Sequence, residues 1–322
     1  MRILRLVSGI MLLVGWVACS SDDPILDEDK DKNPPKEEEE KRPTNIAEYN
    51  AVSEGLKDYY ADFFLLGAAI EPSSLDKQEE VTLLKRHFSS LTAENVMKWS
   101  SLQPSEGNYR WANADRIVDF AQENGMKVRG HTLVWHSQVP DWVFKDGTSS
   151  ASKELVLERM RTHIAEVMTR YKGKVYAWDV VNEVIDDGSS TYRSDSKWYN
   201  ICGPDFIFEA FRAARAADPD AKLYYNDYAA TQPAKRDKIY NLLKKLKEEN
   251  LVDGVGLQGH WNIGAPVNSL IIDAITKYSS LGIDINITEL DVSVYTSNSE
   301  AQVDYVLKAE EQAIAYSRLF LM

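Results

Sequence analysis

Two glutamates of the sequence stand at the ends of apolar segments. Glu183 closes the run AWDVVNE, and Glu289 lies in the run DINITELDV. A single glutamate in such a place would most simply be a solvated loop residue, but two at matching positions favour a catalytic pair. Glycoside hydrolysis requires such a pair, because one carboxyl group protonates the leaving oxygen while the other attacks the anomeric carbon or activates water. The two glutamates therefore predict glycosidase chemistry.

Other polar residues cluster at the ends of further apolar runs, often beside tryptophan. The clusters are Glu94-Asn95 with Lys98-Trp99, His131 with Trp135-His136, Asn182-Glu183, Asn226-Asp227, Gln258 with His260-Trp261, and Glu289 with Asp291. In a parallel α/β barrel the carboxyl ends of the strands converge around one mouth, so residues distant in sequence meet there. We therefore expect these clusters to form a single site.

Short apolar runs alternate with longer amphipathic stretches, a rhythm that favours a parallel sheet covered by helices. The expected strands are residues 63–69, 93–97, 127–134, 175–181, 222–225, 254–258 and 284–288. Residues 152–171 predict a helix, since apolar side chains recur at helical spacing after a serine N-cap. His163 lies in that helix, and we expect it to be a packing residue, because no second metal-binding type repeats at its spacing.

The composition indicates the class of protein and argues against one class of partner. With 44% hydrophobic and 27% charged residues the chain fits a globular protein with a sizeable core. Its net charge of −13, with no basic stripe, argues against a nucleic-acid partner. The eight tryptophans and sixteen tyrosines would suit either core packing or stacking on sugars.

Individual aromatic and histidine residues have simpler explanations than ligand binding. Four tryptophans are expected to pack in the core or at its rim, namely Trp99, Trp111, Trp142 and Trp178. His131 and His136 could suggest a metal pair, but they are five residues apart in a strand-to-loop segment and lack a third ligand. We expect no metal site.

The N-terminus reads as a signal peptide over residues 1–18. Arg2 and Arg5 precede a 13-residue apolar run over residues 6–18, which is short for a membrane span. The run ends in VACS, which resembles the lipobox of bacterial lipoproteins, although Trp16 departs from that pattern. This resemblance implies acylation of Cys19, which would become the first mature residue. An ordinary signal peptide cleaved nearby is the alternative.

Residues 19–44 then form an expected flexible tether. Between residues 22 and 43 there are ten acidic and five basic side chains and almost no apolar ones, so this segment cannot offset the entropy of folding by burial. The folded catalytic domain is expected over residues 45–322. Cys202 is the other cysteine, so no intrachain disulfide is expected once Cys19 is lipidated. The protein would be exported and held at the bacterial envelope, at the outer membrane or cell surface, with membrane contact only through its lipid.

Four motifs together resemble family 10 of the glycoside hydrolases, the retaining endo-β-1,4-xylanases. They are GHTLVWHSQVPDWV, WDVVNEVIDDG, GLQGHW and ITELDV. They occur in the order typical of the family, and the resemblance covers roughly residues 55 to 320. It implies a TIM (β/α)8-type barrel that hydrolyses internal bonds of xylan or xylo-oligosaccharides by a two-glutamate double displacement, without a cofactor and as a monomer.

The resemblance also implies roles for individual residues. Glu183 would be the general acid/base and Glu289 the nucleophile, with Asn182 holding the 2-hydroxyl of the sugar under attack. His260 would hydrogen-bond Glu289, and Asp291 would orient the imidazole. Further positions that would grip sugars on the non-reducing side of the cut are Glu94, Asn95, Lys98, His131, Trp135 and Gln258.

One departure from the family concerns the end of the sequence. Residues 302–319 resemble the helix after strand seven, and the sequence ends at Met322, so the eighth strand and helix are expected to be missing. The chain could then be a fragment, one half of a split enzyme, or a degenerate glycan-binding remnant without turnover. A cellulase or mixed-linkage glucanase on the same scaffold is a further alternative.

Overall fold

The computed structural model describes residues 54–188, 191–296 and 305–321. The expected signal peptide, Cys19 and the tether lie outside these residues. Among the helices of the described segments, none is long and apolar enough to cross a membrane.

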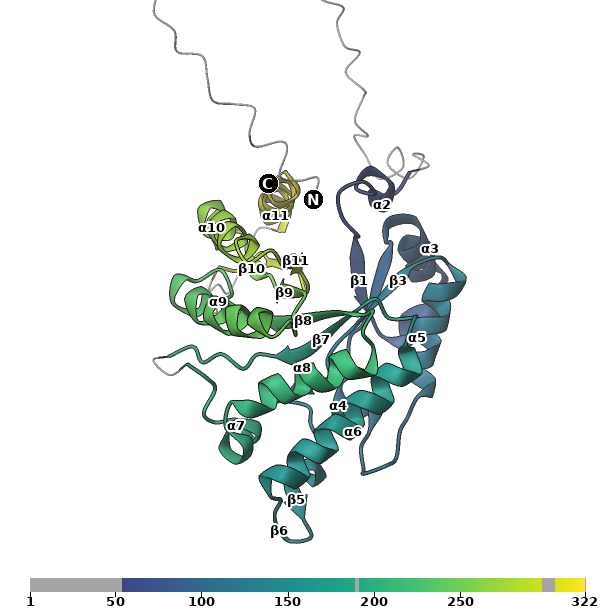
Figure 1. The fold of residues 1–322 in the computed structure, drawn as a ribbon. Helices are drawn as coiled ribbons and strands as arrows, with labels where there is room; N and C mark the ends of the chain where they lie inside the picture. Colours follow the sequence, from purple (N-terminus) through teal and green to yellow (C-terminus); the bar gives the residue numbers. More distant parts are fainter. Residues whose placement is uncertain (1–53, 189–190, 297–304, 322) are drawn as a thin grey trace, which may run out of the picture. The chain divides into compact units, whose positions relative to one another are not determined.

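A parallel sheet whose strands follow one another in chain order forms the centre of the fold (Figure 1). Its strands are β1 (Gly67–Ile70), β2 (Ser90–Ala93), β3 (Lys127–Gly130), β7 (Ala177–Asn182), β8 (Lys222–Asp227), β9 (Gly254–Leu257) and β11 (Asp284–Ile287), with the short β4 (Val134–Trp135) also paired to β7. Sequential parallel pairing with intervening helices is the arrangement of an α/β barrel wall, which confirms the predicted fold class.

Two small strand pairs lie outside this sheet. The hairpin strands β5 (Lys145–Asp146) and β6 (Ser149–Ser150) are antiparallel. The strands β10 (His260–Asn262) and β12 (Asp291–Ser293) are parallel and follow β9 and β11 respectively. The second pair extends the carboxyl ends of two neighbouring barrel strands.

The predicted bounds of two strands were wrong. Residues 63–66 precede β1. The side chains of Phe63, Phe64 and Leu65 are exposed, and only the Leu66 carbonyl accepts hydrogen bonds from the segment that leads into β2. A strand was expected over residues 93–97, but β2 ends at Ala93. The next residues form a turn instead, which the Lys98 amide closes by donating to the Asn95 carbonyl. Short apolar runs at a strand end do not distinguish strand from turn.

Helices cover the outer face of the sheet, and the core lies between the two layers (Figure 1). The helices are α2 (Leu56–Tyr59), α3 (Gln78–His87), α4 (Trp99–Leu102), α5 (Ala112–Glu123), α6 (Lys153–Tyr171), α7 (Lys197–Cys202), α8 (Asp205–Ala217), α9 (Pro233–Glu248), α10 (Asn268–Ser279) and α11 (Tyr305–Phe320), with 3-10 turns η2 (Pro72–Asp76) and η3 (Asp141–Phe144). The Ser152 side chain accepts from the Leu155 amide at 3.2 Å, which confirms the predicted N-cap of α6.

The predicted packing roles of the aromatic residues are confirmed. His163 stacks on Trp99 with ring centroids 3.8 Å apart, and its Nδ1 lies 2.8 Å from Gln103 Oε1. Burial lowers the pKa of His163 to about 3, so the imidazole is neutral. Trp99 and Trp178 are both buried in the core. Trp111 and Trp142 are partly buried and pack against it from the rim.

The path of paired strands is open within the described residues. It begins at β1 and ends at β11, and these two strands do not pair with each other there. Near this gap the ring of Phe320, at the end of α11, lies 5.2 Å from the ring of Tyr60. The described part of the barrel wall thus has two edges.

Candidate active site

Backbone hydrogen bonds between neighbouring strand ends bring the two glutamates to the same edge of the sheet. The Glu183 amide donates to the Asn226 carbonyl at 3.0 Å, and the Glu289 amide donates to the Gln258 carbonyl at 2.8 Å. Glu183 is therefore the first residue after β7 and Glu289 the second after β11, and each is hydrogen-bonded to a neighbouring strand end. As expected for parallel strands, residues far apart in sequence meet at the carboxyl ends.

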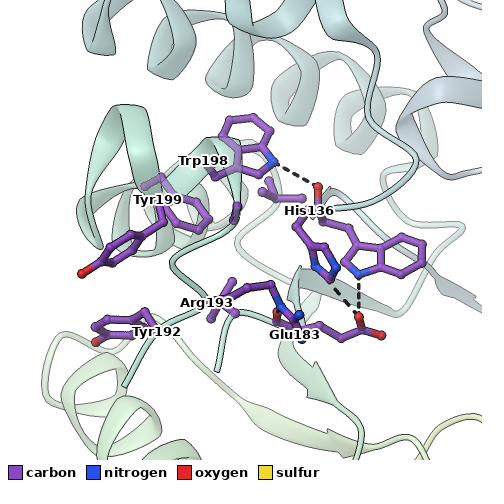
Figure 2. A pocket seen from close by; sticks show the side chains of 11 residues that line it. His136, Glu183, Tyr192, Arg193, Trp198 and Tyr199 are labelled. Atoms are coloured by element: carbon purple, nitrogen blue, oxygen red, sulfur yellow. Dashed lines mark hydrogen bonds and ion pairs between the residues drawn. The ribbon is translucent and has the colours of Figure 1, made fainter. Parts of the chain in front are cut away.

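The carboxylate of Glu183 accepts one hydrogen bond at each oxygen. Trp135 Nε1 donates to Oε2 at 2.8 Å, and Gln258 Nε2 donates to Oε1 at 2.8 Å. His136 Nδ1 lies 3.9 Å from Oε2, on the side of a small cavity that Arg193 also lines (Figure 2). Strand β4 pairs Trp135 with Asn182, which explains why the indole reaches Glu183. Glu183 is thus held firmly beside an aromatic face.

The carboxylate of Glu289 is surrounded by donors. Asn226 Nδ2 donates to Oε1 at 2.8 Å, and His260 Nε2 lies 3.2 Å from Oε2. His260 Nδ1 lies 2.5 Å from Asp291 Oδ2, a contact set by the pairing of His260 with Asp291 in β10 and β12. His131 Nδ1 lies 4.0 Å from Oε1 on the other side.

These contacts determine the charge state of Glu289 and His260. Burial would raise the pKa of Glu289, but the hydrogen bond from His260, the charge of His131 and the hydrogen bond from Asn226 together lower it to about 2. The hydrogen bond to Glu289 is the main cause that raises the pKa of His260 to about 9, and Asp291 adds to it. At neutral pH Glu289 is ionised and His260 is protonated.

Asn226 connects the ends of the two glutamate-bearing strands. Its Nδ2 donates to Asn182 Oδ1 at 2.9 Å as well as to Glu289, and its Oδ1 accepts from Thr288 Oγ1 at 2.6 Å. The sequence placed Asn226 in a polar cluster without assigning it a role. In the structure it fixes the relative position of Asn182 and Glu289.

A second group of polar residues lies beside Trp135. Asn95 Nδ2 donates to Glu71 Oε1 at 2.5 Å, and Lys98 Nζ donates to Asn95 Oδ1 at 3.0 Å. The same ammonium lies 5.3 Å from the centre of the Trp135 ring. Glu94, which follows β2 directly, is exposed. Hydroxyl-binding groups and an aromatic face therefore adjoin Glu183.

A buried charge pair that the sequence did not predict lies next to the site. Asp179 of β7 accepts from Arg129 of β3, and His131 Nδ1 lies 2.7 Å from its Oδ2. Asp179 is fully buried. Its signal was a lone carboxylate inside the apolar run AWDVVNE, which only a charged or hydrogen-bonding partner could make tolerable. Glu71, the partner of Asn95, was also missed, and nothing in its local sequence marks it.

The arrangement offers an ionised carboxylate, a second carboxyl group and a set of hydroxyl-binding side chains at one edge of the sheet. Two carboxyl groups flanking a bond are what glycoside hydrolysis needs. Among the described residues there is no group of three or more His, Cys, Asp or Glu side chains placed to hold a metal ion.

Comparison with known proteins gives consistent matches. The model of a family described as "Glycosyl hydrolase family 10" matches residues 55–321. A "Beta-1,4-xylanase" of Dictyoglomus thermophilum is 45% identical over 82% of this chain and 74% of its own. An "Endo-1,4-beta-xylanase A" of Thermotoga neapolitana is 48% identical over 82% of this chain, which spans only 26% of that longer protein. A solved structure of a mutant in complex with xylotriose is 43% identical, covers 83% of this chain and 82% of its own, and superposes with a TM-score of 0.79.

Proposed function

Because the chain belongs to glycosyl hydrolase family 10, we propose that it is an endo-β-1,4-xylanase that cleaves internal bonds of xylan with retention of configuration. The observation that carries this proposal is that the two glutamate carboxyl groups have different surroundings. Glu289 is kept ionised by His260 and Asn226, while Glu183 lies between the Trp135 indole and the Gln258 amide. Two carboxyl groups in different surroundings suit the two roles of a retaining glycosidase.

In the first step the Glu289 carboxylate attacks the anomeric carbon and forms a glycosyl ester as the bond to the leaving oxygen breaks. Glu183 gives its proton to that oxygen, so the shortened chain departs as an alcohol. In the second step Glu183 takes a proton from a water molecule, whose oxygen attacks the same carbon and displaces Glu289. Two inversions restore the original configuration, and both glutamates return to their starting states.

The substrate would be held on the non-reducing side by residues close to Glu183. Lys98 and Asn95 offer hydrogen bonds to hydroxyl groups and Trp135 offers an aromatic face. Asn182 would contact the 2-hydroxyl of the sugar under attack. The remaining proposed contacts are made by Glu94, His131 and Gln258. No cofactor takes part in this chemistry, and we propose that the protein works as a monomer.

The stereochemical course tests this function directly. Proton NMR of a xylo-oligosaccharide digest should show the β-anomer of the new reducing end first, followed by mutarotation. A Glu289→Ala variant with an unchanged circular dichroism spectrum serves as the inactive control. Early release of the α-anomer would refute the retaining mechanism, and preferential cleavage of mixed-linkage glucan or cellulose would refute the choice of substrate.

We also propose that the protein is exported and anchored by a lipid on Cys19, with residues 1–18 as signal peptide, 19–44 as tether and 45–322 as catalytic domain. Arg2, Arg5 and the apolar run that ends at Cys19 support this proposal. Mass spectrometry of the mature N-terminus should find an acylated Cys19, and Cys19→Ala should release the protein from detergent phase to aqueous phase. An unmodified Cys19, or cleavage elsewhere, would contradict it.

A further inference from the structure

The backbone of Glu183 has an unusual conformation. Its φ angle is +57°, in the left-handed region that residues with a Cβ atom adopt at a cost of about 1–2 kcal/mol. Such a conformation persists only where the surrounding structure fixes it, and it is often found at functional sites. The contacts that fix this backbone therefore bear on the direction in which the Glu183 carboxyl group points.

The hydroxyl of Tyr225 holds the segment that follows Glu183. It accepts hydrogen bonds from the amides of Val184 at 3.1 Å and Ile185 at 3.3 Å. The same hydroxyl donates to Asp227, two residues further along β8 and therefore on the same face of that strand. Tyr225 and Asp227 are both fully buried, so neither water nor solvent ions substitute for these contacts.

Lys235 of α9 contacts Asp227, the residue that accepts from the Tyr225 hydroxyl. Its side chain is 4% exposed, and its Nζ lies 2.9 Å from Asp227 Oδ1 and 2.7 Å from Asp187 Oδ1. The ammonium also lies 3.3 Å from the centre of the Tyr228 ring. A buried cation with two carboxylate partners and an aromatic face is strongly held. Burial already raises the pKa of Asp227 to about 7, so removing the ammonium that lowers this pKa would favour the neutral form of Asp227.

Arg193 holds the carbonyl side of Glu183. Its Nε donates to the Glu183 carbonyl at 3.1 Å, and its Nη2 donates to the Tyr228 hydroxyl at 2.7 Å. Tyr228 in turn donates to Asp187, which is already bound by Lys235. Figure 2 shows Arg193 directly beside Glu183. The contacts from Tyr225 and from Arg193 thus meet at Lys235 and enclose the Glu183 backbone.

We propose that Tyr225 and Lys235 are positioning residues that fix the left-handed backbone of Glu183 and so aim its carboxyl group at the leaving oxygen. This inference rests on the proposed acid/base role of Glu183. Neither residue has to touch the substrate. Proton transfer requires the acid within hydrogen-bond reach of the leaving oxygen, so loss of the backbone support should matter most where the leaving group needs its proton.

Tyr225→Phe tests the proposal because it removes a single oxygen and keeps the ring. We expect kcat/KM for xylo-oligosaccharides, whose leaving group is a sugar alcohol, to fall at least about tenfold. For a dinitrophenyl xylobioside, whose leaving group needs no proton, we expect a fall of less than about threefold. Lys235→Met should show the same dependence on leaving group. Should Tyr225→Phe fail to fold, this second variant decides the question by the same ratio.

Tyr171→Phe is the matched control. It removes the hydroxyl of a buried tyrosine at the end of α6, which donates to Asp115 of α5 at 3.1 Å and not to the Glu183 segment. It should affect both substrates equally. Amide hydrogen exchange gives a readout that does not need activity: the amides of Val184 and Ile185 should lose protection in Tyr225→Phe. Equal losses on both substrates, or unchanged protection, would overturn the proposal. A wild-type protein that cleaves neither substrate would instead refute the proposed function. In that case the exchange of the Val184 and Ile185 amides would still test whether Tyr225 holds the backbone after Glu183.

Discussion

Gly256 of β9 lies directly against the side chain of Asn226 on the neighbouring strand. A Cβ atom added to Gly256 would stand 2.2 Å from Asn226 Oδ1, far closer than real Cβ contacts. The absence of a side chain at this position is what allows Asn226 to reach both Asn182 and Glu289. Gly256 carries no side chain of its own, yet its small size determines how Asn226 contacts Glu289, the proposed nucleophile.

Gly256→Ala should therefore displace Asn226 and weaken its hydrogen bond to Glu289. We expect kcat on xylo-oligosaccharides to fall at least about tenfold, and the free energy of unfolding to fall by about 1–3 kcal/mol from the overpacking. Gly67→Ala is the control, because its Cβ would meet Ser90 at an ordinary 3.5 Å. Steady-state kinetics and urea denaturation would check both, and full activity of Gly256→Ala would show that Asn226 has room to move.

Replacement of the glutamates should separate their roles. Glu289→Ala should abolish turnover while xylo-oligosaccharides still bind, because the proposed sugar contacts are made by other side chains, such as Lys98 and Trp135. Glu183→Ala should lose activity on xylan yet still form the glycosyl-enzyme from activated aryl glycosides, which need little protonation, and then hydrolyse it slowly for want of a base. Burst kinetics and calorimetric titration measure the two effects. Equal losses of Glu183→Ala on aryl and natural substrates would argue against its acid/base role.

The acidic limb of the pH profile should depend on His260. Its hydrogen bond helps to lower the pKa of Glu289 to about 2, so in the native protein Glu289 should not limit activity above about pH 4. His260→Gln should raise that pKa toward its usual value, and the acidic limb of kcat/KM should move to higher pH. Profiles measured from pH 3 to 9 check this, and an unmoved acidic limb would exclude His260 as the cause.

The same ion pair should also affect stability in a defined pH range. The lowered pKa of Glu289 stabilises the fold above its usual value of 4.5 and ceases to do so as the pH falls through about 2. The raised pKa of His260 stabilises the fold below 6.5, and this contribution disappears as the pH rises through about 9. The stability difference between the protein and His260→Gln should be largest from pH 4.5 to 6.5 and should shrink above pH 9. Because His260 is half exposed, we expect about 1 kcal/mol or less, and a difference that grows with pH would refute this assignment.

The distance between the two proposed catalytic carboxyl groups is a further prediction. A retaining mechanism requires Glu183 and Glu289 to stand about 5 to 5.5 Å apart. A crystal structure with a bound xylo-oligosaccharide would measure this distance. A separation near 9 Å would point to inversion instead.

The outer edges of β1 and β11 provide a stability test. Neither edge has a ladder partner within the described residues, and unpaired edges of this kind favour aggregation. A grafted strand and helix that pair with both should raise the melting temperature, since each new buried hydrogen bond contributes about 1 kcal/mol. A graft with proline in its strand is the control, because proline cannot complete the ladder. Equal melting temperatures for residues 45–322 with and without the graft would show that the edges are not a source of instability.

Local sequence determined much of this protein, since it set the strand and helix periodicity, the Ser152 cap of α6 and the packing role of His163. It also placed polar residues at strand ends, from which convergence follows for any parallel barrel. The bounds of β1 and β2 could not be predicted, because a short apolar run looks the same whether it pairs in a strand or enters a turn.

The tertiary structure alone decided how the site is supported. The bonds from Asn226 to Asn182 and Glu289 span 44 and 63 residues, and those from Tyr225 to Val184 and Ile185 span 41 and 40. The ion pair between Lys235 and Asp187 likewise joins α9 to the loop after β7. No local pattern marks such partners, because the fold creates the low-dielectric surroundings in which they must pair. The sequence thus determined which side chains could do the chemistry. The packing of distant strands determined the charge state of these side chains and the direction in which they point.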